Sequence, residues 1–180
     1  NTFASADKKL LSADTDIYDV LAAEMPAEPT GLLVLPYFEA TGPPRFVSDA
    51  SGAIVGLKTS TSRGEILKAI MESETFYFLE GIQALKKLGI DSREFIATGG
   101  GAKSDVWLQI KADILGVPFV RPANTECSVA GAAMLAGLAS GVYKNPAEAA
   151  ECFVQRERVF EPDGNRHKAY QQKYDSYRQL

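Results

Sequence analysis

Hydrophobic and polar positions follow two different periods along the 180 residues of this chain. Helical spacing of apolar residues marks the segments 16–24, 63–88, 104–115, 125–141 and 164–180. Short continuous apolar runs mark the segments 31–38, 53–57, 94–98 and 118–121. The first set predicts helices and the second predicts strands. We therefore expect an α/β fold in which helices pack on a mixed sheet, and the strand–helix–strand order of 94–121 predicts a right-handed crossover between parallel strands.

The longest helical segment, 63–88, has a wide apolar face, so most of it is expected to be buried. Gly89 follows as a natural helix end. The narrow remaining face is expected to be exposed, and it carries Lys68, Glu72, Thr75, Gln83, Lys86 and Lys87.

The segment 125–141 is dense in Ala and Gly, and small side chains let a helix approach its neighbour closely. Asn124 or Thr125 is expected to cap it, because short polar side chains accept hydrogen bonds from the first free amides of a helix.

Composition excludes several classes. The net charge of −4 and the scattered Lys and Arg residues argue against a nucleic-acid partner. No apolar run approaches the roughly 20 residues of a membrane span. Two cysteines, Cys127 and Cys152, are too few for a disulfide framework and suit reduced thiols in the cytoplasm. The chain opens without Met or a signal pattern, which suggests a piece of something longer.

Three consecutive glycines, Gly99, Gly100 and Gly101, stand between a predicted strand and a predicted helix. Without Cβ atoms the backbone there can adopt positive φ and let a ligand come close. The helix that follows offers unpaired N–H groups and the positive end of its dipole, which together favour an anion, usually phosphate.

This turn has three other interpretations. A purely structural tight turn would need one glycine rather than three. A Walker A loop is excluded, because Ala97 and Ala102 occupy its two glycine positions beside Lys103. A dinucleotide-binding turn fits Gly99 and Gly101 but has Ser104 at the third position, and Arg121 could then meet a 2′-phosphate. A dehydrogenase-like module therefore stays open.

Three separated stretches resemble the C-terminal domain of the FGGY family of carbohydrate kinases. The first, IATGGGAKSDVWLQIKADILGVPFVRP, is followed by ECSVAGAAMLAGLASG. The second is GAIVGLKTSTSRGEILKAIME, in which Gly52, Gly56, Glu65, Ile66 and Ala69 hold the places of the family's C-terminal signature. The third is the tyrosine-spaced ending EPDGNRHKAYQQKYDSYRQL.

The resemblance implies a ribonuclease H-like, actin-like ATPase fold with two lobes and ATP between them. Residues 1–180 would form the single C-terminal nucleotide-binding domain, with an arm at 1–30, a core at 31–163 and a terminal helix at 164–180. The N-terminal lobe, absent here, would supply the sugar site, the Asp base and most contacts to Mg²⁺. No catalytic residue and no metal ligand is therefore assigned to this chain.

The resemblance also implies the site residues. The backbone of Gly99, Gly100, Gly101 and Ala102 would face the nucleotide, and Asp105 would lie near the adenine, where glycerol kinase-like members hold Asn. Lys103 and Ser104 are candidate phosphate contacts; Ser104 is also the expected helix N-cap.

The sequence also predicts the surroundings of two single residues. Trp107 is expected to pack its helix onto the core, with stacking on a base as the alternative. His167, the one histidine, is expected to be an exposed surface side chain.

The leading hypothesis is the ATP-binding half of a carbohydrate or polyol kinase that transfers the γ-phosphate of MgATP to a hydroxyl and is inactive as an isolated fragment. A non-catalytic actin-like lobe that binds nucleotide or a partner protein is the alternative. The expected partners are the sugar or polyol substrate and the chain's own N-terminal lobe; a homodimer is compatible with this scheme.

Overall fold

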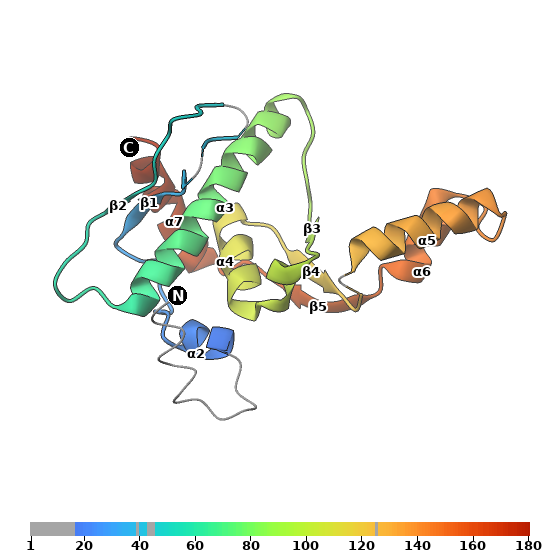
Figure 1. Cartoon of the computed structure of the whole chain (residues 1–180), viewed down its shortest axis with the longest axis horizontal. Helices are drawn as coiled ribbons and strands as arrows, with labels where there is room; N and C mark the ends of the chain where they lie inside the picture. Colours follow the sequence, from blue (N-terminus) through green and yellow to red (C-terminus); the bar gives the residue numbers. More distant parts are fainter. Residues whose placement is uncertain (1–16, 39, 43–45, 125) are drawn as a thin grey trace. The chain divides into compact units, whose positions relative to one another are not determined.

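The computed structural model describes residues 17–38, 40–42, 46–124 and 126–180, which form two compact units (Figure 1). One unit contains the residues up to Ala84 together with Ala169–Leu180, and the other is Leu85–Lys168. The start of the expected arm and the candidate cap Thr125 lie outside the described residues. Among the described helices, none is long and apolar enough to cross a bilayer.

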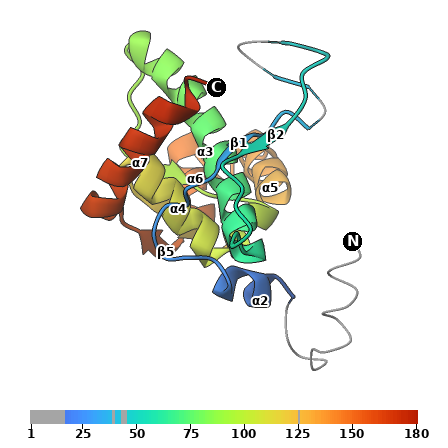
Figure 2. The ribbon, with the colours of Figure 1, turned by 90° about the vertical axis from the view of Figure 1, so that its left-hand side faces the viewer.

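The first unit consists of a small sheet and parts of two long helices. After α2 (Ile17–Ala23), strands β1 (Leu33–Leu35) and β2 (Ala53–Val55) pair antiparallel. Helix α3 (Arg63–Lys87) then supplies its first six turns, and α7 (Gly164–Tyr177) its C-terminal part. Figures 1 and 2 both show the two-stranded sheet beside α3.

Apolar side chains from these elements form the core of the first unit. Leu32 and Val34 from the β1 region pack against Ala69 of α3. Phe76 lies two turns further along α3 and is 1% exposed. The centroid of its ring lies 5.3–6.2 Å from the centroids of three tyrosine rings of α7. These are Tyr170, Tyr174 and Tyr177, so the tyrosine spacing in the sequence marks the buried face of the terminal helix.

Helix α3 begins where a reciprocal cap forms. The Ser62 amide donates to the Glu65 carboxylate at 2.8 Å, and the Glu65 amide donates to the Ser62 hydroxyl at 3.1 Å. This is the capping box that a Ser followed three residues later by Glu produces. The role of Glu65 is therefore structural.

The predicted exposed face of α3 is wrong in its first half. Lys68, Glu72 and Thr75 are 3%, 0% and 1% exposed. The Lys68 ammonium donates to the backbone carbonyls of residues 26, 27 and 28 at 2.8–2.9 Å, so its charge is satisfied without water. Periodicity alone cannot reveal such burial, because the groups that compensate Lys68 lie about 40 residues away in the sequence.

The hydrogen-bond partners of Glu72 also lie far from it in the sequence. Its carboxylate accepts hydrogen bonds from the Thr30 amide and hydroxyl, from the Tyr170 hydroxyl and from the Lys173 ammonium. Burial lowers the pKa of Lys173, while the charge of Glu72 opposes that change. A buried carboxylate needs this full set of donors, since an unpaired charge in the interior is costly.

The second unit is built on a three-stranded sheet in the order β3–β4–β5. Strands β3 (Phe95–Ile96) and β4 (Phe119–Pro122) are parallel, which confirms the predicted pairing, and α4 (Asp105–Leu115) connects them. Strand β5 (Arg156–Phe160) pairs antiparallel with β4 and was not predicted, because only Phe160 of its residues is buried. The sheet is mixed, as expected.

Helix α4 covers this sheet. Its Leu108 and Ala112 are completely buried and meet Phe119 of β4 and Phe160 of β5. The helix ends at Gly116, which adopts the left-handed conformation with φ +69° and donates its amide to the Ala112 carbonyl. The predicted stop at this glycine is thus confirmed.

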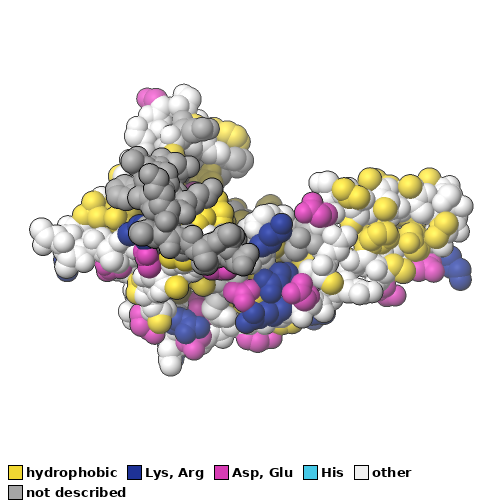
Figure 3. Space-filling model, turned by 60° about the horizontal axis from the view of Figure 1, so that its bottom comes forward, with side chains coloured by type: hydrophobic (Ala, Val, Ile, Leu, Met, Phe, Trp, Pro, Cys, Tyr) yellow, Lys and Arg dark blue, Asp and Glu magenta, His cyan; other side chains and the backbone are white. Residues whose placement is uncertain are grey.

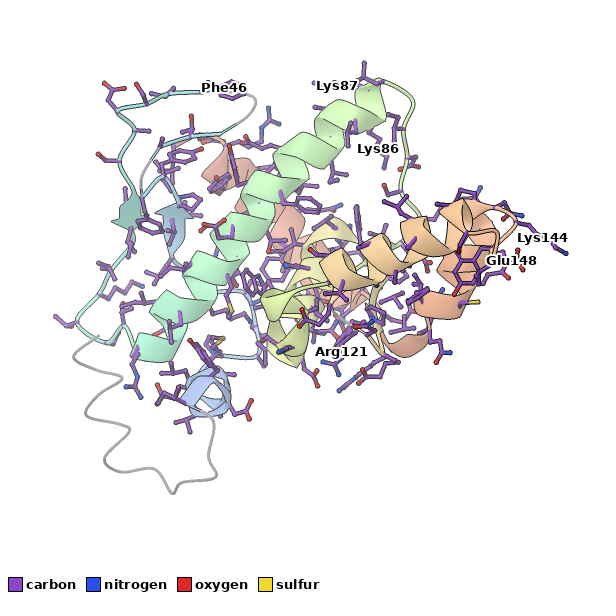
Figure 4. The ribbon with its side chains drawn as sticks, turned by 45° about the vertical axis from the view of Figure 1, so that its right-hand side comes forward. Phe46, Lys86, Lys87, Arg121, Lys144 and Glu148 are labelled. Atoms are coloured by element: carbon purple, nitrogen blue, oxygen red, sulfur yellow. The ribbon has the colours of Figure 1, made fainter. Side chains whose placement is uncertain are left out.

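Two further helices, α5 (Cys127–Ala139) and α6 (Pro146–Phe153), pack on each other. Helix α6 was not predicted; Asn145 caps it, and the Lys144 amide donates to Glu148 at the same end, where Figure 4 labels both residues. Helix α5 begins later than predicted, with Glu126 rather than Asn124 at its N-cap. Large apolar side chains of this pair remain exposed (Figure 3).

Candidate functional site

The glycine turn lies in the second unit, directly after β3. Gly99 has φ +77° and ψ −169°, a conformation that L side chains rarely adopt, so glycine is required there. Gly100–Lys103 form the short 3₁₀ helix η1, and Ser104 links it to α4. Gly99 and Gly100 are exposed, so the turn is accessible from outside the protein.

The two sides of this turn differ in the space around them. A Cβ atom added to Gly99 or Gly100 would find no atom within 4 Å. A Cβ atom added to Gly101 would lie 3.2 Å from the Trp107 ring. Ala102 is 2% exposed, so its side chain points inward. A ligand can therefore approach Gly99 and Gly100, whereas Gly101 is glycine because Trp107 packs on it.

Backbone amides at the turn are available to such a ligand. The first hydrogen bond of η1 runs from the Ala102 amide to the Gly99 carbonyl at 3.1 Å. The amides of Gly100 and Gly101 precede it and have no acceptor within η1, as at the start of any helix. Unpaired amides at a helix start favour an anion.

Ser104 is the N-cap of α4, as predicted. Its hydroxyl accepts a hydrogen bond from the Trp107 amide at 3.3 Å. Its side chain is thus engaged in holding the helix start, while Lys103 beside it is exposed.

Asp105 lies at the first position of α4 and is bound by two arginines. Arg121 of β4 donates to one carboxylate oxygen at 2.6 Å, and Arg158 of β5 donates to the other. From the sequence, Arg121 is a candidate only as a ligand of a 2′-phosphate, and Arg158 was not predicted. Alternating charge along 156–158, which places Arg156 and Arg158 on one face of a strand, was the signal that could have located it.

Trp107 packs against the turn itself. The Lys111 ammonium lies 4.4 Å from the centroid of its ring, and burial lowers the pKa of Lys111. The indole Nε1 is buried and has no hydrogen-bond partner within the described residues. The Trp107 ring of α4 therefore packs against Gly101 of η1.

The prediction of an exposed His167 is wrong. Its ring is partly buried, and Nδ1 lies 2.8 Å from the Asp113 carbonyl oxygen at the end of α4. Asp113, which is 2% exposed, also accepts from the Asp163 amide and from Arg166. A histidine among charged residues looks exposed in the sequence. Here its charged neighbours Asp163 and Arg166 bind Asp113 and so connect the start of α7 to the end of α4.

No group of three His, Cys, Asp or Glu residues in the described part of the chain is arranged to hold a metal ion.

Comparison with known proteins decides the family. The family described as "FGGY family of carbohydrate kinases, C-terminal domain" matches this chain over residues 2–140. The chain belongs to this family. The FGGY resemblance stated from the motifs is thus confirmed, and the dehydrogenase-like alternative is not supported.

Three similar proteins show the sequence identity and the coverage of the match to FGGY kinases. Xylulose kinase of Bacillus subtilis is 33% identical over 156 residues, which is 87% of this chain and 31% of that protein. Glycerol kinase of Ralstonia pickettii is 38% identical over 143 residues, which is 79% of this chain and 28% of that protein. The crystal structure of ligand-bound xylulose kinase from Lactobacillus acidophilus gives a TM-score of 0.80 at 28% identity, covering 98% of this chain and 36% of that one.

This FGGY chain thus spans about a third of the length of the relatives it matches. The matched structure also confirms the expected fold, the C-terminal domain of an actin-like kinase.

Proposed function

We propose that this chain is the nucleotide-binding part of a two-lobe kinase that transfers the γ-phosphate of ATP to a hydroxyl of a sugar or polyol. The observation that carries the proposal is the open, exposed backbone of Gly99 and Gly100 at the start of η1 and α4. Relatives named xylulose kinase and glycerol kinase support a small polyhydroxylated acceptor.

Phosphoryl transfer depends mainly on positioning and on stabilising the charge of the phosphate oxygens. ATP would supply the phosphoryl group, and Mg²⁺ would balance part of its charge. The part of this chain is to hold the nucleotide: the amides of Gly100 and Gly101 donate to phosphate oxygens, and the exposed Lys103 is long enough to add a cationic contact. The backbone of Ala102 completes the nucleotide contacts in this proposal. Asp105, whose two carboxylate oxygens accept from Arg121 and Arg158, lies beside the nucleotide without contacting its phosphates.

The same proposal keeps residues 1–180 as one functional domain, with the acceptor site, the catalytic base and most metal contacts on a second lobe. The short coverage of the relatives supports a larger polypeptide. A cytoplasmic location follows from the metabolic chemistry proposed. We expect no sugar phosphorylation by the 180 residues alone, because the proposal places the catalytic base on the second lobe.

Calorimetric titration with ADP, ATP and NADP tests the nucleotide assignment. We expect ADP and ATP to bind and NADP to bind at least about tenfold more weakly. The variant Gly100→Val places a branched side chain in the open space over the turn, so it should lower ADP affinity by at least about tenfold.

Gly131→Val is the matched control, because a Cβ atom at Gly131 in α5 also meets no atom within 4 Å. It should leave ADP affinity unchanged within about twofold. Equal ADP binding by Gly100→Val and the parent chain would show that the turn is not the phosphate site.

A further inference from the structure

Asp105, Arg121 and Arg158 form a three-membered charge cluster at the edge of the glycine turn. Each carboxylate oxygen of Asp105 accepts from a different arginine. The three residues come from α4, β4 and β5, so the cluster joins the start of the helix to two strands of the sheet. Figure 4 labels Arg121, the member from the central strand.

The register of the sheet makes this arrangement unusual. Arg121 and Arg158 are direct partners across the antiparallel β4–β5 pair. Like charges in directly opposite positions repel each other. Asp105 relieves that repulsion, because its carboxylate binds both guanidinium groups. The position of the acid is thus determined by two cations rather than by the helix alone.

Arg121 also contacts the turn itself. Its Nη1 lies 3.5 Å from the Ala102 carbonyl oxygen of η1, and only 14% of its side chain is exposed. Its guanidinium carbon lies 5.6 Å from the centroid of the Phe160 ring. Arg121 therefore lies between the sheet and the turn and contacts both.

The charges in this cluster balance. Asp105 and Glu157, whose Oε1 lies 3.5 Å from Arg121, carry two negative charges, and Arg121 and Arg158 carry two positive ones. Ion pairs whose acidic partners are about half exposed contribute little to folding stability. Their more important effect is local, because an unbalanced carboxylate on the first residue of α4 would repel an anion at the turn.

We propose that Arg121 is a positioning residue which, together with Arg158, neutralises Asp105 so that a polyphosphate can approach the glycine turn. This inference rests on the proposed function and adds a determinant of affinity for it. Arg121 acts through Asp105 and the turn, with no contact of its own to the ligand. Its loss leaves one excess negative charge beside the phosphates.

The experiment measures calorimetric affinities of the chain for ADP and AMP. Arg121→Met should weaken ADP binding about tenfold and AMP binding less, because AMP carries less charge. The double variant Arg121→Met, Asp105→Asn should recover ADP affinity to within about threefold of the parent, since the repelling carboxylate is gone. Arg156→Met is the control; Arg156 lies on β5 near Arg158 but pairs with Glu94, so ADP affinity should not change.

Several results would overturn the inference. Unchanged ADP affinity in Arg121→Met would remove the role of Arg121. Equal losses for ADP and AMP, or no recovery in the double variant, would show that Arg121 acts through packing or touches the nucleotide itself. Failure of the proposed function looks different: the parent chain would bind no ADP, or Gly100→Val would bind it normally.

Discussion

Glu72 and Lys173 form an ion pair between α3 and α7 in which the carboxylate is fully buried and the ammonium side chain is 10% exposed. They lie 101 residues apart in the sequence. The pair therefore joins the long helix to the terminal helix inside the first unit, and the two helices depend on each other for stability.

Removing one member of this pair leaves an uncompensated buried charge. Lys173→Met should lower the free energy of unfolding by about 3 kcal/mol, whereas Lys168→Met, an exposed lysine on the same helix, should change it by less than about 0.5 kcal/mol. Urea unfolding of both variants gives these values. Equal stability of the two variants would mean that Glu72 needs no cation.

Gly116 tests the contact between the end of α4 and His167. A Cβ atom at this glycine would lie 2.5 Å from Cε1 of His167, and φ is +69°. Gly116→Ala should cost about 2 kcal/mol or more, from backbone strain and the clash together. Gly89→Ala is the control, because it has φ +81° and no neighbour within 4 Å, so it carries the strain alone, about 1 kcal/mol.

A double variant separates the two contributions at Gly116. In a His167→Ala background, the cost of Gly116→Ala in thermal or urea unfolding should fall to the value for Gly89→Ala. An unchanged cost would place the clash elsewhere.

Ionisation of Asp163 should make the free energy of unfolding depend on pH, and the direction of that dependence follows from its contacts. The Arg166 amide, which donates to its carboxylate at 2.9 Å, lowers the pKa of Asp163, with help from the Arg166 charge and the Asn165 amide. A lowered pKa in the folded state stabilises the protein above the unfolded pKa of about 3.9, and that stabilisation is lost as the pH falls through the folded value. The stability difference between the parent and Asp163→Asn should therefore be constant from pH 7 to 5 and shrink below pH 4.

Urea midpoints measured from pH 7 to pH 2 check this expectation. A difference that stays constant down to pH 2 would show that the ionised form of Asp163 has no special stabilisation in the folded chain.

The part of this structure that local patterns determine was predictable. The glycine turn, the cap at Ser104 and the stop at Gly116 each follow from the conformation that one or two residues prefer. The parallel pairing of β3 and β4 follows from the strand–helix–strand order.

Features that depend on distant partners were not predictable. Lys68 and Glu72 look like surface residues until the backbone near 27 and the side chain of Lys173 are placed beside them. Strand β5 was missed because charged residues alternate along it and bury little. For the same reason, the bond between Asp105 and Arg158 could not be anticipated from either segment alone.

Trp107, the single tryptophan, reports on the packed side of the turn. Gly101→Ala forces a methyl group against its ring, which is tighter than ordinary contact, so the indole must shift. We expect a change in the fluorescence emission of Trp107 and a loss of about 1 kcal/mol in stability. Gly100→Ala should leave both unchanged, and an equal response from the two variants would contradict the assignment of open and packed sides.

The most direct measurement of the central claim is an NMR titration of the ¹⁵N-labelled chain with ADP. If the amides at the start of η1 receive the phosphates, the largest shift changes will fall on residues 99–104, and inorganic sulfate at high concentration will compete with them. If ADP binds while these amides keep their positions, or if it produces no saturable shift anywhere, then the glycine turn does not bind nucleotide and the account is wrong.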